Sequence, residues 1–228
     1  MIKASTIAAG LAFALAASAQ AAVFDFNDAA FLDTTVDSVT TSDGSITATL
    51  TTKRNARGTL IDGIAAIFDT QNPNNGLSGS NGDNDLTEGS GLFTGTGFGG
   101  ALIISETGKT AGVALSPADD NASGGTITFD FGSTLVNLVS FDILYDATVT
   151  AISNGVSVTA IVGTDGGFGT GFDLSALTNV STVTFDFNGA SGAIDNFVVN
   201  AVTPVPLPAG LPLLLAGLGG FALLRRRK

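Results

Sequence analysis

The amino-acid sequence predicts an all-β protein built as an antiparallel β-sandwich or jelly roll. Three observations support this fold class. Short stretches between residues 22 and 202 alternate large apolar side chains with polar ones, turn-forming Gly, Asn and Asp separate them, and none carries the apolar stripe of an amphipathic helix. A region of this length is enough for one domain with a sizeable core.

Residues 1–21 have the three-part order of a secretory signal peptide. One cation, Lys3, precedes an apolar stretch from Ile7 to Ala17, and small residues with Ala-x-Ala spacing follow. The apolar stretch is too short to span a bilayer as a helix. We therefore expect the chain to be exported and the mature protein to begin near Ala22.

Period-two alternation marks the expected strands. Around residues 125–132 and 181–189, phenylalanine and β-branched residues alternate with Thr and Asp, which predicts half-buried strands. Two other stretches share this period, and their expected inward faces are Val139, Phe141, Ile143 and Tyr145 in one, and Val156, Val158, Ala160 and Val162 in the other. Further strands are expected to begin near residues 23, 45, 63, 101 and 193.

The tripeptide Phe-Asp-Phe occurs three times, beginning at residues 24, 129 and 185. Its spacings are unequal and its flanks differ, so we interpret it as strand patterning, with Phe inward and Asp outward, rather than as a repeat array. By contrast, residues 69–100 show no strand pattern. A loop of this length in a compact domain is usually functional, ordered by a metal, or mobile.

The region between residues 22 and 202 is strongly acidic. It holds all 20 acidic residues, 18 Asp and 2 Glu, and its only cations are Lys53, Arg54, Arg57 and Lys109, so its net charge is 4 − 20 = −16. Such a surface repels nucleic acid and anionic membranes and suits cation binding or simple solubility. The chain has no Cys, so no disulfide stabilises it.

Several aspartates are candidate calcium ligands. Asp83, Asn84 and Asp85 lie in a glycine-rich loop after Asp69, and hard oxygen ligands on a flexible backbone suit Ca²⁺. However, the loop matches the β-roll nonapeptide and the EF-hand loop only in part. A solvated polar loop without metal is the competing interpretation.

Other aspartates precede or enter strands and are expected to gather at one end of the sandwich, where they would coordinate one structural ion. Each of them is also a common turn residue, so a role without metal stays open. The candidate calcium ligands are Asp69, Asp83, Asp85, Asp119, Asp120 and Asp195.

Catalysis has little support in the composition. The chain has no His and no Cys, so the common nucleophile–base arrangements are absent. Paired aspartates are able in principle to hydrolyse glycosides, but Glu is nearly missing and no carboxylate pair stands out in the sequence. We therefore predict that the protein is not an enzyme.

Residues 203–228 have the features of a processed membrane segment. Pro204, Pro206 and Pro208 hold their stretch extended, and residues 207–224 are 18 uncharged, mostly apolar residues, near the minimum for a transmembrane helix. The chain then ends in four cations, which should stay cytoplasmic and leave the domain outside. These cations are Arg225, Arg226, Arg227 and Lys228.

This three-part order resembles the PEP-CTERM class of protein-sorting signals, in its Val-Pro-Leu-Pro-Ala variant. The short motif consists of Val205, Pro206, Leu207, Pro208, Ala209 and Gly210. The resemblance implies export by a Gram-negative bacterium, processing at the motif by a membrane-embedded exosortase, and an association with exopolysaccharide and biofilm production. Gly210, where Ala or Ser is common, and the extra Pro212 depart from the pattern.

The region from about 64 to 199 is similar to a group of such exported proteins. The shared features are an Ile-Phe-Asp strand, an Asp-x-Asp-Leu loop, a Leu-Ile-Ile-Ser-Glu strand, the stretch from Asp119 to Phe131, and a final Asp-Asn-Phe strand. This resemblance implies a β-sandwich of the galactose-binding-like or jelly-roll kind. It brings no known activity.

Together these features predict a signal peptide (1–21), an exported acidic β-sandwich domain (22–202) and a sorting signal (203–228). The expected function is a non-enzymatic structural or interaction role at the cell surface or in the extracellular matrix. The expected partners are signal peptidase, an exosortase-type enzyme, extracellular polysaccharide and, transiently, the inner membrane. Two alternatives remain: a carbohydrate-binding module or adhesin with structural Ca²⁺ that acts through residues 69–100, and a secreted hydrolase that uses Asp carboxylates.

Overall fold

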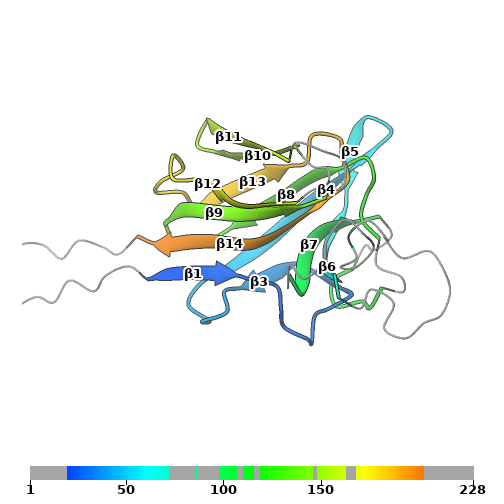
Figure 1. Ribbon diagram of the computed structural model, residues 1–228, viewed down its shortest axis with the longest axis horizontal. Coiled ribbons are helices and arrows are strands. Elements are labelled where there is room, and N and C mark those ends of the chain that lie inside the picture. Colours follow the sequence, from blue (N-terminus) through cyan, green and yellow to red (C-terminus); the bar gives the residue numbers. More distant parts are fainter. Residues whose placement is uncertain are drawn as a thin grey trace, which may run out of the picture. The chain divides into compact units, whose positions relative to one another are not determined.

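The computed structural model describes residues 20–71, 86, 98–106, 110–115, 119–145, 148–162 and 168–202. Fourteen β-strands and no helix occur in these ranges. The strands form two seven-stranded sheets that pack face to face (Figure 1). Every strand pair within the sheets is antiparallel, so the prediction of an antiparallel β-sandwich is confirmed.

The first sheet, sheet A, has the strand order β12-β9-β14-β7-β6-β2, with β1 paired to β14. Its members are β12 (Phe168–Asp173), β9 (Val136–Leu144), β14 (Ala193–Ala201), β7 (Gly100–Ser105), β6 (Ile64–Asp69), β2 (Thr34–Val36) and β1 (Ala21–Phe24). The second sheet, sheet B, has the order β11-β10-β13-β8-β4-β3, with β5 paired to β4. Its members are β11 (Val156–Ile161), β10 (Thr148–Ser153), β13 (Thr182–Asp186), β8 (Gly125–Asp130), β4 (Thr47–Ala56), β3 (Ser38–Thr40) and β5 (Thr59–Asp62).

The described residues form the middle of the chain. The expected signal peptide and sorting segment fall on residues 1–19 and 203–228, which lie outside the described residues. The described strands belong to one compact unit, Ala19–Val202. The described ranges contain no helix that is long and apolar enough to cross a membrane.

The three Phe-Asp-Phe tripeptides meet between the sheets. Phe24 of β1, Phe129 of β8 and Phe185 of β13 are fully buried, and Phe197 of β14 lies among them, with ring centroids 5.6, 5.1 and 5.1 Å from the three rings. Most of these contacts are edge-to-face, a favourable geometry for aromatic rings. The Asp of each tripeptide is half-buried or exposed. The expected arrangement, Phe inward and Asp outward, is confirmed.

Both expected inward faces are partly wrong. In β11, Ala160 is buried as expected, but Val156 is 44% exposed. Of the four side chains expected to face inward in and just after β9, Phe141 and Ile143 enter the core between the sheets, whereas Val139 and Tyr145 do not. The inward residue before Phe141 is Leu138, three positions earlier. The β9–β14 ladder changes register at this point, and such a bulge shifts the alternation by one residue.

Part of the outer face of sheet A is also covered. Leu86 and Phe98, from the segment without strand pattern, pack on Phe68, Ile103 and Leu144 of β6, β7 and β9. Leu86 is fully buried by this packing. Polar residues on this part of sheet A therefore lie in a covered environment, whereas alternation alone would place them in water.

The packing predicts that Phe129→Ala strongly destabilises the protein. The change removes a ring that contacts both sheets, and truncation of a fully buried Phe costs about 3–5 kcal/mol of unfolding free energy. Phe31→Ala, at a position where the ring is 47% exposed, is the matched control and should cost about 1 kcal/mol or less. Urea unfolding of both variants measures the difference. Equal losses for the two variants would contradict the assigned core.

Candidate functional site

A first pair of aspartates lies where β6 ends and β2 is about to begin. Asp33 and Asp69 are 5% and 7% exposed. Oδ1 of Asp33 accepts a hydrogen bond from the backbone N–H of Asp69 (3.1 Å), and Oδ1 of Asp69 accepts one from the N–H of Gln71 (3.0 Å). Burial raises the pKa of Asp33 to about 6; the bond from Asp69 opposes this rise and the charge of Asp69 adds to it.

A second pair lies on adjacent strands of sheet A. Asp142 of β9 and Asp195 of β14 are direct partners in the ladder, and both are buried. The side-chain amide of Asn196 donates to Oδ2 of Asp142 (2.9 Å) and to Oδ2 of Asp195 (3.2 Å). Oδ1 of Asp142 accepts the N–H of Gly171 (2.7 Å). Backbone and amide donors thus hold Asp142, whereas Asp195 receives less support.

Asp195 has the most perturbed environment of the described acidic residues. Its side chain is 0% exposed, and its Oδ1 is buried without a hydrogen-bond partner. Burial raises the pKa of Asp195 to about 8; a hydrogen bond from the Asn196 backbone opposes the rise, and the charges of Asp142 and Asp25 add to it. Like charges directly opposite in a sheet repel each other. This carboxyl therefore holds a proton near neutral pH unless a bound cation replaces it.

The side chain of Asp120 links two segments of the fold by hydrogen bonds. Its Oδ2 accepts hydrogen bonds from the hydroxyl of Ser191 (2.7 Å) and from the backbone N–H of Gly192. These bonds tie the turn before β8 to the start of β14. Asp119 is half-buried, and its backbone carbonyl accepts the N–H of Glu106 (3.1 Å).

The structure does not bring the predicted calcium ligands together as one described group. Asp69 and Asp195 belong to different pairs, and Asp83 and Asp85 lie outside the described residues. In the part of the chain that the structure describes, no three acidic side chains are placed to hold a metal ion. The calcium site stays a prediction.

Sequence reasoning missed the partners of these aspartates. Asp33 pairs with Asp69, and Asp142 pairs with Asp195. The available signal for Asp142 was its position between the inward residues Phe141 and Ile143. Alternation placed it on the opposite face, but only the folded chain shows that this face is buried.

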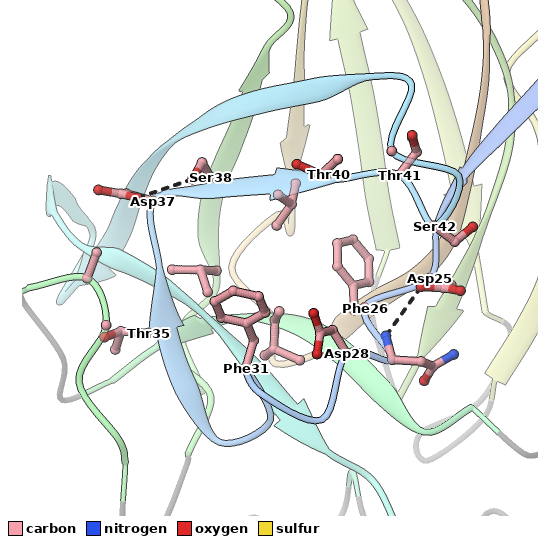
Figure 2. A pocket seen from close by; sticks show the side chains of 17 residues that line it. Asp25, Phe26, Asp28, Phe31, Thr35, Asp37, Ser38, Thr40, Thr41 and Ser42 are labelled. Carbon is pink, nitrogen blue, oxygen red and sulfur yellow. Dashed lines mark hydrogen bonds between the residues drawn. The ribbon is translucent and has the colours of Figure 1, made fainter.

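A pocket of about 820 Å³ opens at the edge of the sandwich, where the chain passes from β2 in sheet A to β3 in sheet B (Figure 2). Its apolar lining includes Phe26, Val36, Val39 and Ile67, together with the exposed ring of Phe31. This lining gives the pocket an apolar floor of the kind that holds small ligands or anchoring side chains.

The described lining of this pocket is acidic. Asp25, Asp28 and Asp37 line it, and none of the described lining residues is Lys or Arg. Figure 2 shows Asp28 between the rings of Phe26 and Phe31, with Asp37 on the other side of the cavity. The arrangement suits a group that joins an apolar surface to a positive charge or to hydroxyls. The sequence signal for this pocket is the high frequency of Asp and Thr between residues 25 and 43.

Comparisons with protein-family models, curated proteins and solved structures found no match for this chain.

Neither buried aspartate pair lines the pocket. The described part of the fold therefore offers two separate features for function: buried carboxylate pairs on sheet A and an open acidic pocket at the sandwich edge.

The raised pKa of Asp195 predicts that stability falls as the pH rises from about 4 to about 8 in the presence of EDTA. In this window the folded state keeps a proton that the unfolded state has lost, so the free energy of unfolding decreases by up to about 1.4 kcal/mol per pH unit. Asp33 contributes with the same sign up to about pH 6. Urea unfolding at pH 5 and pH 8 measures the effect.

The neutral variant Asp195→Asn should remove most of this pH dependence, because an amide does not titrate. Asp130→Asn, at an exposed position on β8, is the control and should keep it. A wild-type protein that is more stable at pH 8 than at pH 5 would rule out a protonated Asp195.

Proposed function

We propose that this chain is an exported protein of the cell surface or extracellular matrix of a Gram-negative bacterium, with a non-enzymatic structural or interaction role. The observation that carries the proposal is the order of features in residues 205–228. A proline-containing motif (205–210) overlaps the start of an uncharged stretch of 18 residues (207–224), and four cations (225–228) follow that stretch. An exosortase-type enzyme would process the chain at this motif. The signal-like residues 1–21 support the same route.

The described domain is compatible with this role. It is an acidic sandwich without cysteine, and its pocket is open at the edge. Strands β7 to β10 alternate between sheets A and B, and so do β12, β13 and β14. This alternation supports a jelly-roll or galactose-binding-like subclass of sandwich, which we include in the proposal.

We also propose that the domain binds Ca²⁺ through its paired aspartates. Asp69 and Asp195, two of the ligands predicted from sequence, each lie beside another carboxylate. A divalent cation would offset the repulsion within such a pair, and the free Oδ1 of Asp195 is a hard oxygen ligand of the type that Ca²⁺ prefers. The further ligands would come from backbone carbonyls or from Asp83 and Asp85.

The second candidate function is carbohydrate binding, as a module or adhesin. The pocket favours it, because hydroxyl-bearing Ser and Thr side chains and carboxylates line a cavity with exposed Phe31. A glycan array with purified protein separates this candidate from a purely structural role. A panel of glycosidase substrates, tested with and without metal, addresses the alternative of a hydrolase.

The sorting proposal predicts that replacing Pro206 and Pro208 with Ala blocks processing. The substitutions remove the extended conformation that an enzyme needs to reach the motif, so the unprocessed chain should accumulate in the inner membrane. Cell fractionation and immunoblotting measure this. Pro212→Ala, outside the motif, is the control and should be processed normally. Normal release of the double variant would refute the sorting role.

The calcium proposal predicts that Ca²⁺ raises the melting temperature of the EDTA-treated protein. At about 100 times the dissociation constant, linkage supplies about 2.7 kcal/mol, which corresponds to a shift of several degrees. Asp69→Asn and Asp195→Asn should reduce the shift, whereas Asp130→Asn should not. A thermal melt that is unchanged when Ca²⁺ is added back after EDTA would end the idea.

A further inference from the structure

The β4–β5 hairpin, residues 53–62 and called the arm below, concentrates the positive charge of the domain. Of the four cations between residues 22 and 202, Lys53, Arg54 and Arg57 lie on the arm, beside a single acid, Asp62. The arm therefore carries 3 − 1 = +2, and the rest of this region carries 1 − 19 = −18. The domain is divided into a small basic element and a large acidic body.

The arm also exposes apolar side chains. All four residues of β5 are exposed, including Leu60 at 52% and Ile61 at 38%. Within the described chain, β5 pairs with β4 alone, so its second edge has no strand beside it. Figure 1 shows this hairpin projecting beyond the other strands of sheet B. A projecting element with exposed apolar residues on a free edge is typical of an interaction surface.

The tip of the arm violates local turn preferences. Arg57 and Gly58 form its two-residue loop with φ values of 55° and 83°, a geometry that favours Asn-Gly or Asp-Gly. A long side chain at positive φ is uncommon and carries a local cost. Lys53 pairs with Asp62 at 2.8 Å, but among the described residues no ion pair includes Arg57. The charge of Arg57, exposed at the tip, is therefore accessible to a partner.

The acidic pocket described above complements the arm. It combines Asp25, Asp28 and Asp37 with the exposed ring of Phe31, and no cation occurs among its described lining residues. An Arg is able to pair with a carboxylate while its plane stacks on an aromatic ring, and Asp28 and Phe31 are adjacent in the pocket (Figure 2). Apolar side chains of the arm would cover the apolar part of the lining.

The arm and the pocket of one molecule lie too far apart to meet. The arm tip follows Ala56, at one end of β4, whereas the turn that brings Thr41 and Gly44 to the pocket precedes Thr47, at the other end. Nine steps along a strand span about 30 Å. Figure 1 likewise shows β5 and β3 on different sides of the sandwich.

We propose that the arm of one copy docks into the acidic pocket of a second copy, with Arg57 against Asp28 and with Leu60 and Ile61 against Phe31. The contact joins two different surfaces, so each docked molecule still offers a free arm or a free pocket. Heterologous contacts of this kind build open chains unless a ring closes. Such assembly goes beyond export and sorting and would hold even if the sorting proposal failed.

The test is self-capture between two differently tagged full-length chains, kept in an uncharged detergent at about 0.15 M salt, where long-range repulsion between the acidic bodies is screened. Immobilised wild-type chain should capture wild-type prey. Arg57→Asp on both chains should lower capture by about tenfold or more, and so should Asp28→Lys on both chains. Asp is tolerated at positive φ, so the first variant keeps the turn.

The decisive measurement mixes the two variants. A bait with Arg57→Asp keeps an intact pocket, and a prey with Asp28→Lys keeps an intact arm, so this mixture should restore capture. Asp130→Lys is the control. It reverses one charge at a residue that belongs neither to the arm nor to the described pocket lining, and Asp130, like Asp28, accepts the N–H of the residue two positions later. This variant should capture like the wild type.

Several results would overturn the proposal. These are absence of wild-type self-capture, capture that neither variant reduces, failure of the mixture to restore capture, or equal loss with the Asp130→Lys control. Thermal melts of each variant establish that it is folded. Absence of self-capture together with Asp28-dependent glycan binding would show that the pocket holds polysaccharide and not a second copy.

Discussion

The cluster of phenylalanine rings between the sheets is the interaction on which the rest of the structure depends. Phe24 and Phe197 come from sheet A, and Phe129 and Phe185 come from sheet B, so their contacts join strands from both ends and the middle of the chain. Apolar burial must supply most of the cohesion, because the chain has no cysteine and only one ion pair among the described residues. Edge-to-face packing also fixes how the two sheets lie on each other, since each ring fits between rings of the opposite sheet. The two sheet edges that frame the pocket inherit their positions from this core.

The same packing explains why acidic groups are buried. Phe197 faces the core in a strand whose bulge places Asn196 at a φ of 46°, a conformation that Asn tolerates better than most residues. This bulge sets Asp195 on the opposite face, directly across from Asp142. Because Leu86 and Phe98 cover part of that face, this part of sheet A has buried apolar side chains on both of its faces. The raised pKa of Asp195 is thus a consequence of the strand register, which places Asp142 opposite it, and of the burial of this face.

The sequence predicted those parts of the fold that local alternation determines. All nine expected strands exist, because Phe and β-branched residues at every second position form one apolar face, and the burial of that face stabilises the strand. Strands β2, β3, β5, β10 and β12 were not anticipated: two have three residues, and β12 is rich in glycine. The inward face of β9 failed at Val139, since a bulge depends on the partner strand. Asp69 and Asp195 were identified, but their partners Asp33 and Asp142 were not, because pairing and coverage are properties of the assembled sheet.

The division of charge follows from how far β4 extends. Strand β4 pairs with β8 only as far as Arg54. Beyond that residue, the end of β4 and the whole of β5 pair only with each other. Cations placed there do not neutralise the acidic body, and that body repels other copies from nearly every direction. An approach that brings the arm of one copy toward an acidic surface is the exception. The repulsion between acidic bodies therefore also selects the orientation of approach, because it disfavours contacts that leave the arm unused. Repulsion between the acidic bodies and attraction between arm and pocket contribute to the binding free energy with opposite signs. Both nevertheless favour the same docking geometry, in which the arm of one copy meets the pocket of another.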